Sequence, residues 1–206
     1  MRYMMKWLGM MVCVLSMSVS SAYAQTGDAP EEVVKSAIDG IISVLKARED
    51  TSKVSAADRA AIRAKVDGRF DYREMARRSV GKLWKKQSEE KQRAFTDVFR
   101  DLLEYTYSNR LATYRNQVVE YDAAEFKKKK ARVKSRVVDG SKITPVAYRL
   151  HQTEHGWMVY DIKIEGVSLI GTFRKDFKST LRQKGFDVLL DALKKKVEKM
   201  KQKVEG

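Results

Sequence analysis

The spacing of apolar residues changes from a helical period to a strand period at about residue 117. Over residues 95–111, apolar side chains recur every three or four positions, which predicts an amphipathic helix. Beyond residue 117, apolar and polar residues alternate, as they do in strands with one buried face. The helical period returns after Gly166. We therefore predict an α+β fold in which a helical N-terminal half packs on a sheet and further helices follow it.

Four helices are expected in the first half: over about residues 30–45 and 55–66, a third around residues 75–80 with Trp84 at its far end, and a fourth over about 88–111. Asp28 is a candidate cap for the first helix, which has Pro30 in its first turn. Ser55 and Asp58 make a capping-box pattern at the start of the second helix. Ser88 precedes the longest and most strongly periodic helix.

Four strands are expected next, over residues 118–121, 131–138, 143–151 and 157–164. Asp139 and Gly140 suit a tight hairpin between the second and third of them. His155 and Gly156 can form the following turn. The strands should therefore form an antiparallel meander. The run of four lysines at residues 127–130 reads as a solvated loop between strands.

The first 24 residues have the pattern of a cleavable signal peptide. Two basic residues precede an apolar stretch at 7–19, and a small-x-small pattern at 22–24 predicts cleavage after Ala24. A membrane anchor is the alternative, but serines interrupt the apolar stretch before it reaches the length of a span. We expect a single periplasmic domain over residues 25–206, without Cys13, the only cysteine.

The expected mature chain is strongly basic. The leader holds two of the 42 basic residues and none of the 27 acidic ones, so the remainder carries a charge of +13. Such a field attracts polyanions. In the periplasm these are anionic lipid headgroups and lipopolysaccharide, and no nucleic-acid partner is expected. Solvated lysine faces are the alternative explanation for much of this charge.

Two local patterns resemble catalytic motifs. Residues 151–155 match the H-x-x-E-H zinc string, which requires a helix that brings both imidazoles to one face, whereas here the segment joins two strands. Residues 166–171 are one residue too long for a G-x-S-x-G nucleophile elbow. Ser168 is better explained as the N-cap of a helix that ends at Gly185, with a last helix from near Asp187. We therefore expect a protein without enzymatic activity that needs no metal or other cofactor. The remaining enzymatic alternative is a hydrolase that uses His151 and His155.

Two segments carry a family resemblance: WxxYDxxxEGVSLI at residues 157–170 and LRxKGxDxL at 181–189. They resemble the C-terminal half of the MlaC family, also called the toluene-tolerance auxiliary family. The long helix at 95–111 is similar to the matching helix of that family. Members are periplasmic phospholipid-binding proteins of the Mla intermembrane lipid transport system. The resemblance implies a curved, NTF2-like or cystatin-like antiparallel sheet that encloses an apolar lipid cavity with its helices.

The resemblance also implies a function and partners. The cargo would be a diacyl phospholipid, carried between the outer and inner membranes to maintain outer-membrane lipid asymmetry. The partners would be an outer-membrane lipoprotein–porin complex and the MCE-domain subunit of an inner-membrane ABC transporter, with the carrier itself a monomer. A carrier of hopanoids or another apolar lipid would have a similar sequence. The alternative from a different functional class is a periplasmic adaptor protein that binds no lipid and whose apolar faces form a filled core.

A carrier of this kind has to enclose both acyl chains. At about 0.8 kcal/mol per methylene, exposing about 30 methylenes would cost on the order of 24 kcal/mol. Two chains also need more room than a drug-sized pocket of about 300–1,000 Å³. The candidate wall residues belong to the apolar strand face, the long helix opposite it and the strand-to-helix junction: Val146, Tyr148, Leu150, Tyr160, Ile162, Ile164, Phe99, Leu102, Leu103, Tyr107, Val167 and Leu169. Each could equally be part of a filled core, because periodicity identifies a face and not what lies against it.

Overall fold

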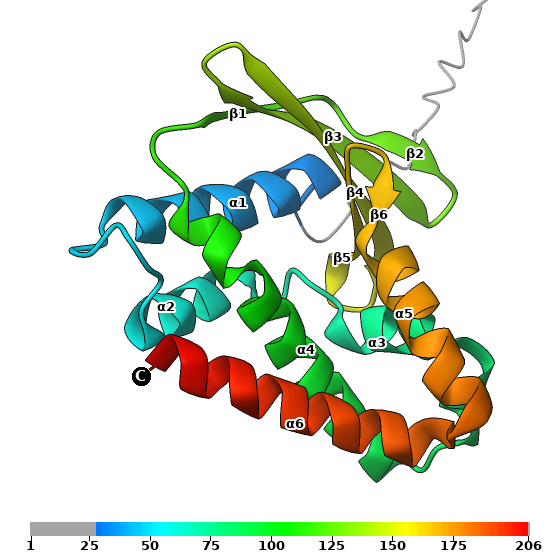
Figure 1. The fold of residues 1–206 in the computed structure, drawn as a ribbon. Coiled ribbons are helices and arrows are strands. Elements are labelled where there is room, and N and C mark those ends of the chain that lie inside the picture. The colour runs from blue at the N-terminus through cyan, green and yellow to red at the C-terminus, as the bar shows by residue number, and fades with distance from the viewer. Residues whose placement is uncertain (1–27, 206) are drawn as a thin grey trace, which may run out of the picture.

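The computed structural model describes residues 28–205, in which helices and strands follow the predicted order (Figure 1). The helices are α1 (Pro30–Lys46), α2 (Ala56–Val66), α3 (Tyr72–Val80), the 3₁₀ helix η1 (Gly81–Lys86), α4 (Glu89–Ala112), α5 (Leu169–Gln183) and α6 (Gly185–Glu205). The strands are β1 (Val118–Tyr121), β2 (Glu125–Lys127), β3 (Lys130–Asp139), β4 (Lys142–Thr153), β5 (Gly156–Ile164) and β6 (Val167–Ser168). The predicted leader lies outside the described residues. None of the described helices is long and apolar enough to cross a membrane.

The strands form one antiparallel sheet in the order β1-β3-β4-β5-β6, with β2 also paired to β3. The predicted α+β class and the meander are therefore confirmed. Gly140 and Gly156 adopt positive φ angles of 58° and 97° in the two predicted turns, where a side chain would be strained. The prediction of a loop for the lysine run was partly wrong. Lys127 ends β2 and pairs with Lys130 of β3 across a tight turn.

A β-bulge interrupts the pairing of β4 with β5. Leu150 pairs with Val159 and Arg149 pairs with Asp161, which leaves Tyr160 as the extra residue. The backbone of Val159 also exchanges hydrogen bonds with the chain before α3: its N–H donates to the Arg69 carbonyl at 2.8 Å, and its carbonyl accepts from the Asp71 N–H at 2.9 Å. The bulge thus ties α3 to the sheet.

Most helix starts follow the predicted capping chemistry. Ser55 accepts a hydrogen bond from the Asp58 N–H at 3.1 Å, and the Asp58 carboxylate accepts one from the Ser55 N–H at 2.9 Å, so the capping box is confirmed. Ser88 likewise caps α4. Asp28 does not cap α1. Because proline favours the first helical position, α1 begins at Pro30, and Ala29 is its N-cap without a side-chain hydrogen bond.

The segment that carries the resemblance has a buried carboxylate at its centre. Asp161 on β5 is 3% exposed and accepts hydrogen bonds from the Ser168 hydroxyl and from the Ile170 N–H. Ser168 in turn caps α5 through the Gly171 N–H at 2.9 Å, as predicted. The carboxylate therefore fixes the direction in which α5 leaves the sheet.

The helices form two layers on the sheet. α1, α3 and α5 contact its strands, while α6 packs along α4 and α2 packs against α1 (Figure 1). The main hydrophobic cluster lies between sheet and helices. At its centre Phe95 stacks on Phe99, and Phe177 packs edge-on against both rings. A second, smaller cluster joins α1, α2 and the end of α4: Leu45, Val54, Ile62 and Ala112. The described core is thus divided in two.

Candidate functional site: an apolar cavity

A cavity of about 220 Å³, partly open to solvent, lies among α1, α2, α3, α4 and β5. Its apolar wall consists of Ile38, Ile41, Val54, Ile62, Val66, Phe70, Tyr72, Met75, Leu103, Tyr107, Leu111, Ile162, Ile164 and Leu169. Some of these side chains belong to the main cluster and others to the smaller one. The cavity is therefore the space across which the two hydrophobic clusters face each other without filling the gap.

Five of the twelve predicted wall residues line this cavity: Leu103, Tyr107, Ile162, Ile164 and Leu169. They come from α4, β5 and the start of α5, which are the elements expected to oppose one another. That they contact a lipid remains a prediction.

The other seven predicted residues lie elsewhere: Phe99, Leu102, Val146, Tyr148, Leu150, Tyr160 and Val167. Phe99, Leu102 and Leu150 are fully buried in the main cluster, where they pack against other side chains. Tyr160 is the bulge residue, and its ring packs against Arg78 and His151. Val167 on β6 is 64% exposed.

Sequence reasoning missed the contribution of α1, α2 and α3 to the cavity. Ile38 and Ile41 on α1 line it, as do Ile62 and Val66 on α2. A signal for the first pair was present, because both belong to the apolar stripe of α1, which needed a surface to pack on. Nothing in the spacing indicated that this stripe faces the long helix across an opening.

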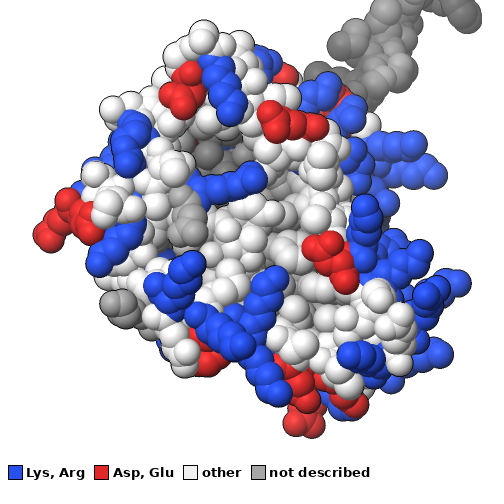
Figure 2. All heavy atoms as spheres, viewed as in Figure 1, with Lys and Arg blue, Asp and Glu red and all other residues white. Residues whose placement is uncertain are grey.

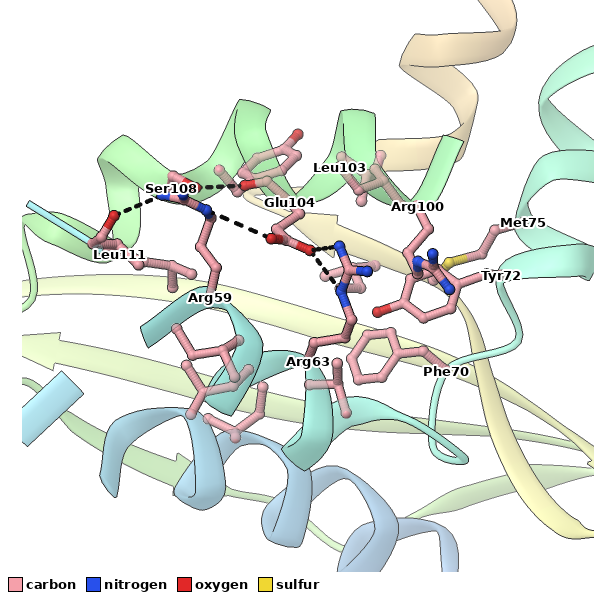
Figure 3. Close-up of a pocket in the computed structure, with 18 of the residues that line it drawn as sticks. Arg59, Arg63, Phe70, Tyr72, Met75, Arg100, Leu103, Glu104, Ser108 and Leu111 are labelled. Atoms are coloured by element: carbon pink, nitrogen blue, oxygen red, sulfur yellow. Dashed lines mark hydrogen bonds and ion pairs between the residues drawn. The ribbon is translucent and has the colours of Figure 1, made fainter. Parts of the chain in front are cut away.

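Ion pairs close the cavity where α2 meets α4. Arg63 donates from its Nε to a Glu104 carboxylate oxygen at 3.0 Å (Figure 3). It also donates from its Nη2 to Asp101 at 2.9 Å. Arg59, which is 3% exposed, forms an ion pair with Glu104 at 3.7 Å. We call these four residues, Arg59, Arg63, Asp101 and Glu104, the α2–α4 ion-pair seam. Burial alone would lower the pKa of Arg63, but the neighbouring carboxylates outweigh it and raise that pKa.

The two histidines and the two tryptophans of the described residues lie away from the cavity wall. His151 is on β4 and hydrogen-bonds through Nε2 to Asp71 at 2.9 Å, whereas His155 is exposed in the turn before β5. The described residues contain no group of three or more His, Cys, Asp or Glu side chains that could hold a metal ion. Trp84 packs edge-to-face on Phe95 in the core, and Trp157 is 5% exposed.

Basic side chains are spread over the surface. Lys and Arg outnumber Asp and Glu in Figure 2 and extend over several elements on that face. Exposed lysines are frequent on α6, where they include Lys195, Lys196 and Lys199. Arg149 on β4 pairs with the buried Asp161 at 3.4 Å.

Comparisons with known proteins point to one family. The family model described as MlaC protein matches residues 35–195. A curated relative is the intermembrane phospholipid transport system binding protein MlaC of Haemophilus influenzae, which is 21% identical over 192 residues that cover 90% of each chain. A solved structure of a phospholipid-binding protein from Ralstonia solanacearum, in complex with a phospholipid, matches with a TM-score of 0.77 and 25% identity. This match covers 84% of the present chain and 99% of the other.

Proposed function

This chain belongs to the MlaC family, and we propose that it is a periplasmic carrier of diacyl phospholipid within an Mla-type intermembrane transport system. It would bind one lipid by the acyl chains, inside the cavity between α1–α4 and β5, and perform no covalent chemistry. The phospholipid bound by the Ralstonia solanacearum protein and the transport role named for the Haemophilus influenzae protein support this assignment.

The observation that carries the proposal is the apolar cavity between two hydrophobic clusters. Protein interiors are normally packed as densely as organic crystals, and an apolar void costs stability because its wall atoms lack contacts. A lipid chain supplies those missing contacts. An adaptor that bound no lipid would gain nothing from the void and would be more stable with the space filled.

The size of the cavity sets a condition on loading. Its volume of about 220 Å³ is below the range of roughly 300–1,000 Å³ that holds drug-sized ligands, and two acyl chains need more. The walls must therefore separate when a lipid enters. We expect this at the α2–α4 ion-pair seam, because polar side chains that separate there can bind water, whereas separated apolar side chains would be exposed to it.

The proposed transport requires two membrane partners. On the family resemblance we expect an outer-membrane lipoprotein–porin complex at one end and the MCE-domain subunit of an inner-membrane ABC transporter at the other. The carrier would pass between them as a monomer, without a cofactor. A periplasmic location requires export, for which residues 1–24 have the expected pattern.

The central test is direct identification of the cargo. The mature protein is purified from the periplasm without detergent and extracted with organic solvent, and the extract is analysed by mass spectrometry. We expect close to one diacyl phospholipid per protein. A clean extract from a protein that also fails to take up lipid from vesicles would refute the carrier proposal, and recovery of hopanoids would reassign the cargo.

A further inference from the structure

The cavity wall carries more positively charged side chains than negatively charged ones. Among the described residues that line the cavity, the charged ones are Arg59, Arg63, Arg100 and Glu104, and all four come from α2 and α4 (Figure 3). The rest of the wall is apolar or carries only hydroxyl groups. One edge of an otherwise apolar cavity thus has three cations and one anion.

The single carboxylate on the wall is already shared by two arginines. Glu104 is paired with Arg63 at 2.5 Å through Nη2 and with Arg59 at 3.7 Å. Its side chain is 17% exposed, so water screens these pairs only in part. Glu104 is therefore paired with the two arginines of α2. Of the three arginines on the wall, Arg100 has the weakest pairing with carboxylates.

Arg100 is poorly paired for a partly buried arginine. Its Nε is buried and makes no hydrogen bond within residues 28–205. Its carboxylate contacts are long: 3.5 Å from Nε to Asp101, and 3.8 Å from Nη2 to Asp97, whose side chain is 64% exposed. A guanidinium has five N–H donors in a planar arrangement that matches two oxygens of one anion. Arg100 thus retains unused donors at the cavity wall.

Tyr72 adds a neutral donor at the same edge. It lines the cavity from α3, and its hydroxyl donates no hydrogen bond to the described part of the chain. In Figure 3 the hydroxyl points to the side of the ring where Arg63 and Phe70 lie. Burial raises the pKa of Tyr72 to about 12, and Asp67 adds to this effect. The phenol therefore remains protonated, and able to donate, throughout the physiological range.

We propose that Arg100 and Tyr72, with Arg63 beside them, form a phosphate-binding site at the edge of the cavity, which selects phospholipids over neutral lipids with the same acyl chains. This inference rests on the proposed function and adds to it a basis for choosing the cargo. A phosphodiester has one negative charge and two free oxygens, which suit the paired donors of a guanidinium. The partial exposure of Arg63 and Arg100, at 34% and 30%, leaves the remainder of the headgroup in water.

The site explains how a charged lipid could sit against an apolar cavity. Burying a phosphate without partners is costly, so a phosphate at the edge of the cavity needs donors or water. The acyl chains would extend past Leu103 and Ile162 into the space between the clusters, while the phosphate would lie between α2, α3 and α4. A neutral lipid would leave the donors of Arg100 and Tyr72 without an anion.

The test uses two fluorescent lipids with identical chains, phosphatidylglycerol and diacylglycerol, offered to the delipidated mature protein. Tyr72→Phe removes one hydroxyl and keeps the ring, and Arg100→Gln removes the guanidinium. A charge-assisted hydrogen bond is worth about tenfold or more in affinity, so each variant should bind phosphatidylglycerol about tenfold more weakly and diacylglycerol as the wild type does. Arg100→Lys keeps the charge and should recover part of the loss.

Arg93→Gln is the matched control. Arg93 lies on the same helix, is 67% exposed and does not line the cavity. Within residues 28–205 its ion pair is a long one, to Glu89 at 3.8 Å. Its replacement should change the affinity for neither lipid. Circular dichroism on every variant separates loss of binding from loss of fold.

Three results would overturn the assignment. If both variants bind phosphatidylglycerol as the wild type does, or lose both lipids equally while folded, the phosphate site is wrong although the carrier proposal stands. If millimolar inorganic phosphate binds the delipidated protein through Arg100 and Tyr72 but does not compete with phospholipid, the site takes free phosphate and not a lipid headgroup. A wild-type protein that binds neither lipid would instead refute the carrier proposal itself.

Discussion

Replacing Ile162 by glutamate separates a cavity wall from a filled core. Ile162 lies on β5 opposite Tyr148, is partly buried and faces the cavity. Full burial of such a side chain is worth about 1.5–3 kcal/mol, so the partly buried Ile162 contributes about 1–2 kcal/mol to the unfolding free energy. In the unloaded protein the new carboxylate can be hydrated, because the cavity is partly open. Against a typical stability of about 5–15 kcal/mol, Ile162→Glu should remain folded.

The loaded state is affected far more strongly. Acyl chains would remove water from the carboxylate, and the effective cost of burying one unpaired ion in a protein is several kcal/mol. Even about 3 kcal/mol corresponds to a loss of affinity of roughly 150-fold. We therefore expect Ile162→Glu to be purified with little or no lipid and to fail in uptake from vesicles.

The control for Ile162→Glu is Val159→Glu on the same strand. Val159 is 0% exposed, pairs with Leu150 and does not line the cavity, so a carboxylate there has no access to water. It should unfold the protein or lower its melting temperature sharply, as measured by circular dichroism. The reasoning fails if Ile162→Glu retains wild-type amounts of lipid, or if it unfolds as Val159→Glu does.

Three further predictions concern packing, capping and acidity. Leu103→Phe, which adds volume to the cavity wall, should reduce lipid content with little change in melting temperature, whereas Leu102→Phe in the filled core should cost about 1–3 kcal/mol of stability in denaturant titrations. Ser55→Ala removes the hydroxyl of the α2 capping box and should lower the unfolding free energy by about 1 kcal/mol in the same titrations. Burial acts to raise the pKa of Glu74, but Arg77 and Arg78 outweigh it and hold this pKa below its ordinary value of 4.5. The ionised Glu74 side chain therefore stabilises the fold above pH 4.5, and this stabilisation is lost as the pH falls further. Glu74→Gln should therefore reduce the loss of stability below pH 4.5, and an unchanged acid titration would contradict this.

The order and type of the elements were predictable because they depend on local chemistry. The switch of apolar period at residue 117 located the sheet, and Ser55, Ser88 and Ser168 marked helix starts through their side-chain caps. β2 was missed because it has only three residues, all of them exposed, so it shows no alternation. The bulge was missed for another reason: Tyr160 continues an alternating apolar pattern whether or not it pairs, and only the partner strand shows that it does not.

The cavity was only partly predictable, because periodicity identifies a buried face and not its depth. Leu102 and Leu103 are neighbours on α4 with the same side chain, yet Leu103 lines the cavity and Leu102 is enclosed in the main cluster. The difference depends on whether another element fills the space in front of each side chain. For Leu103 that space is bounded by α2 and α3, whose positions are set by packing between distant parts of the chain.

The α2–α4 ion-pair seam was hidden from the sequence for a related reason. In each helix taken alone, charged residues such as Arg63 and Glu104 look like parts of a solvated face. In the fold these two faces meet and close a cavity that is otherwise apolar (Figure 3). If this edge were made of leucine, opening it would expose apolar surface at about 25 cal/mol per Å². Because the pair of Arg63 with Asp101 is partly exposed, at 34% and 32%, water can replace these partners at small cost. A polar edge on an apolar cavity therefore allows a carrier to open and reload without losing its core.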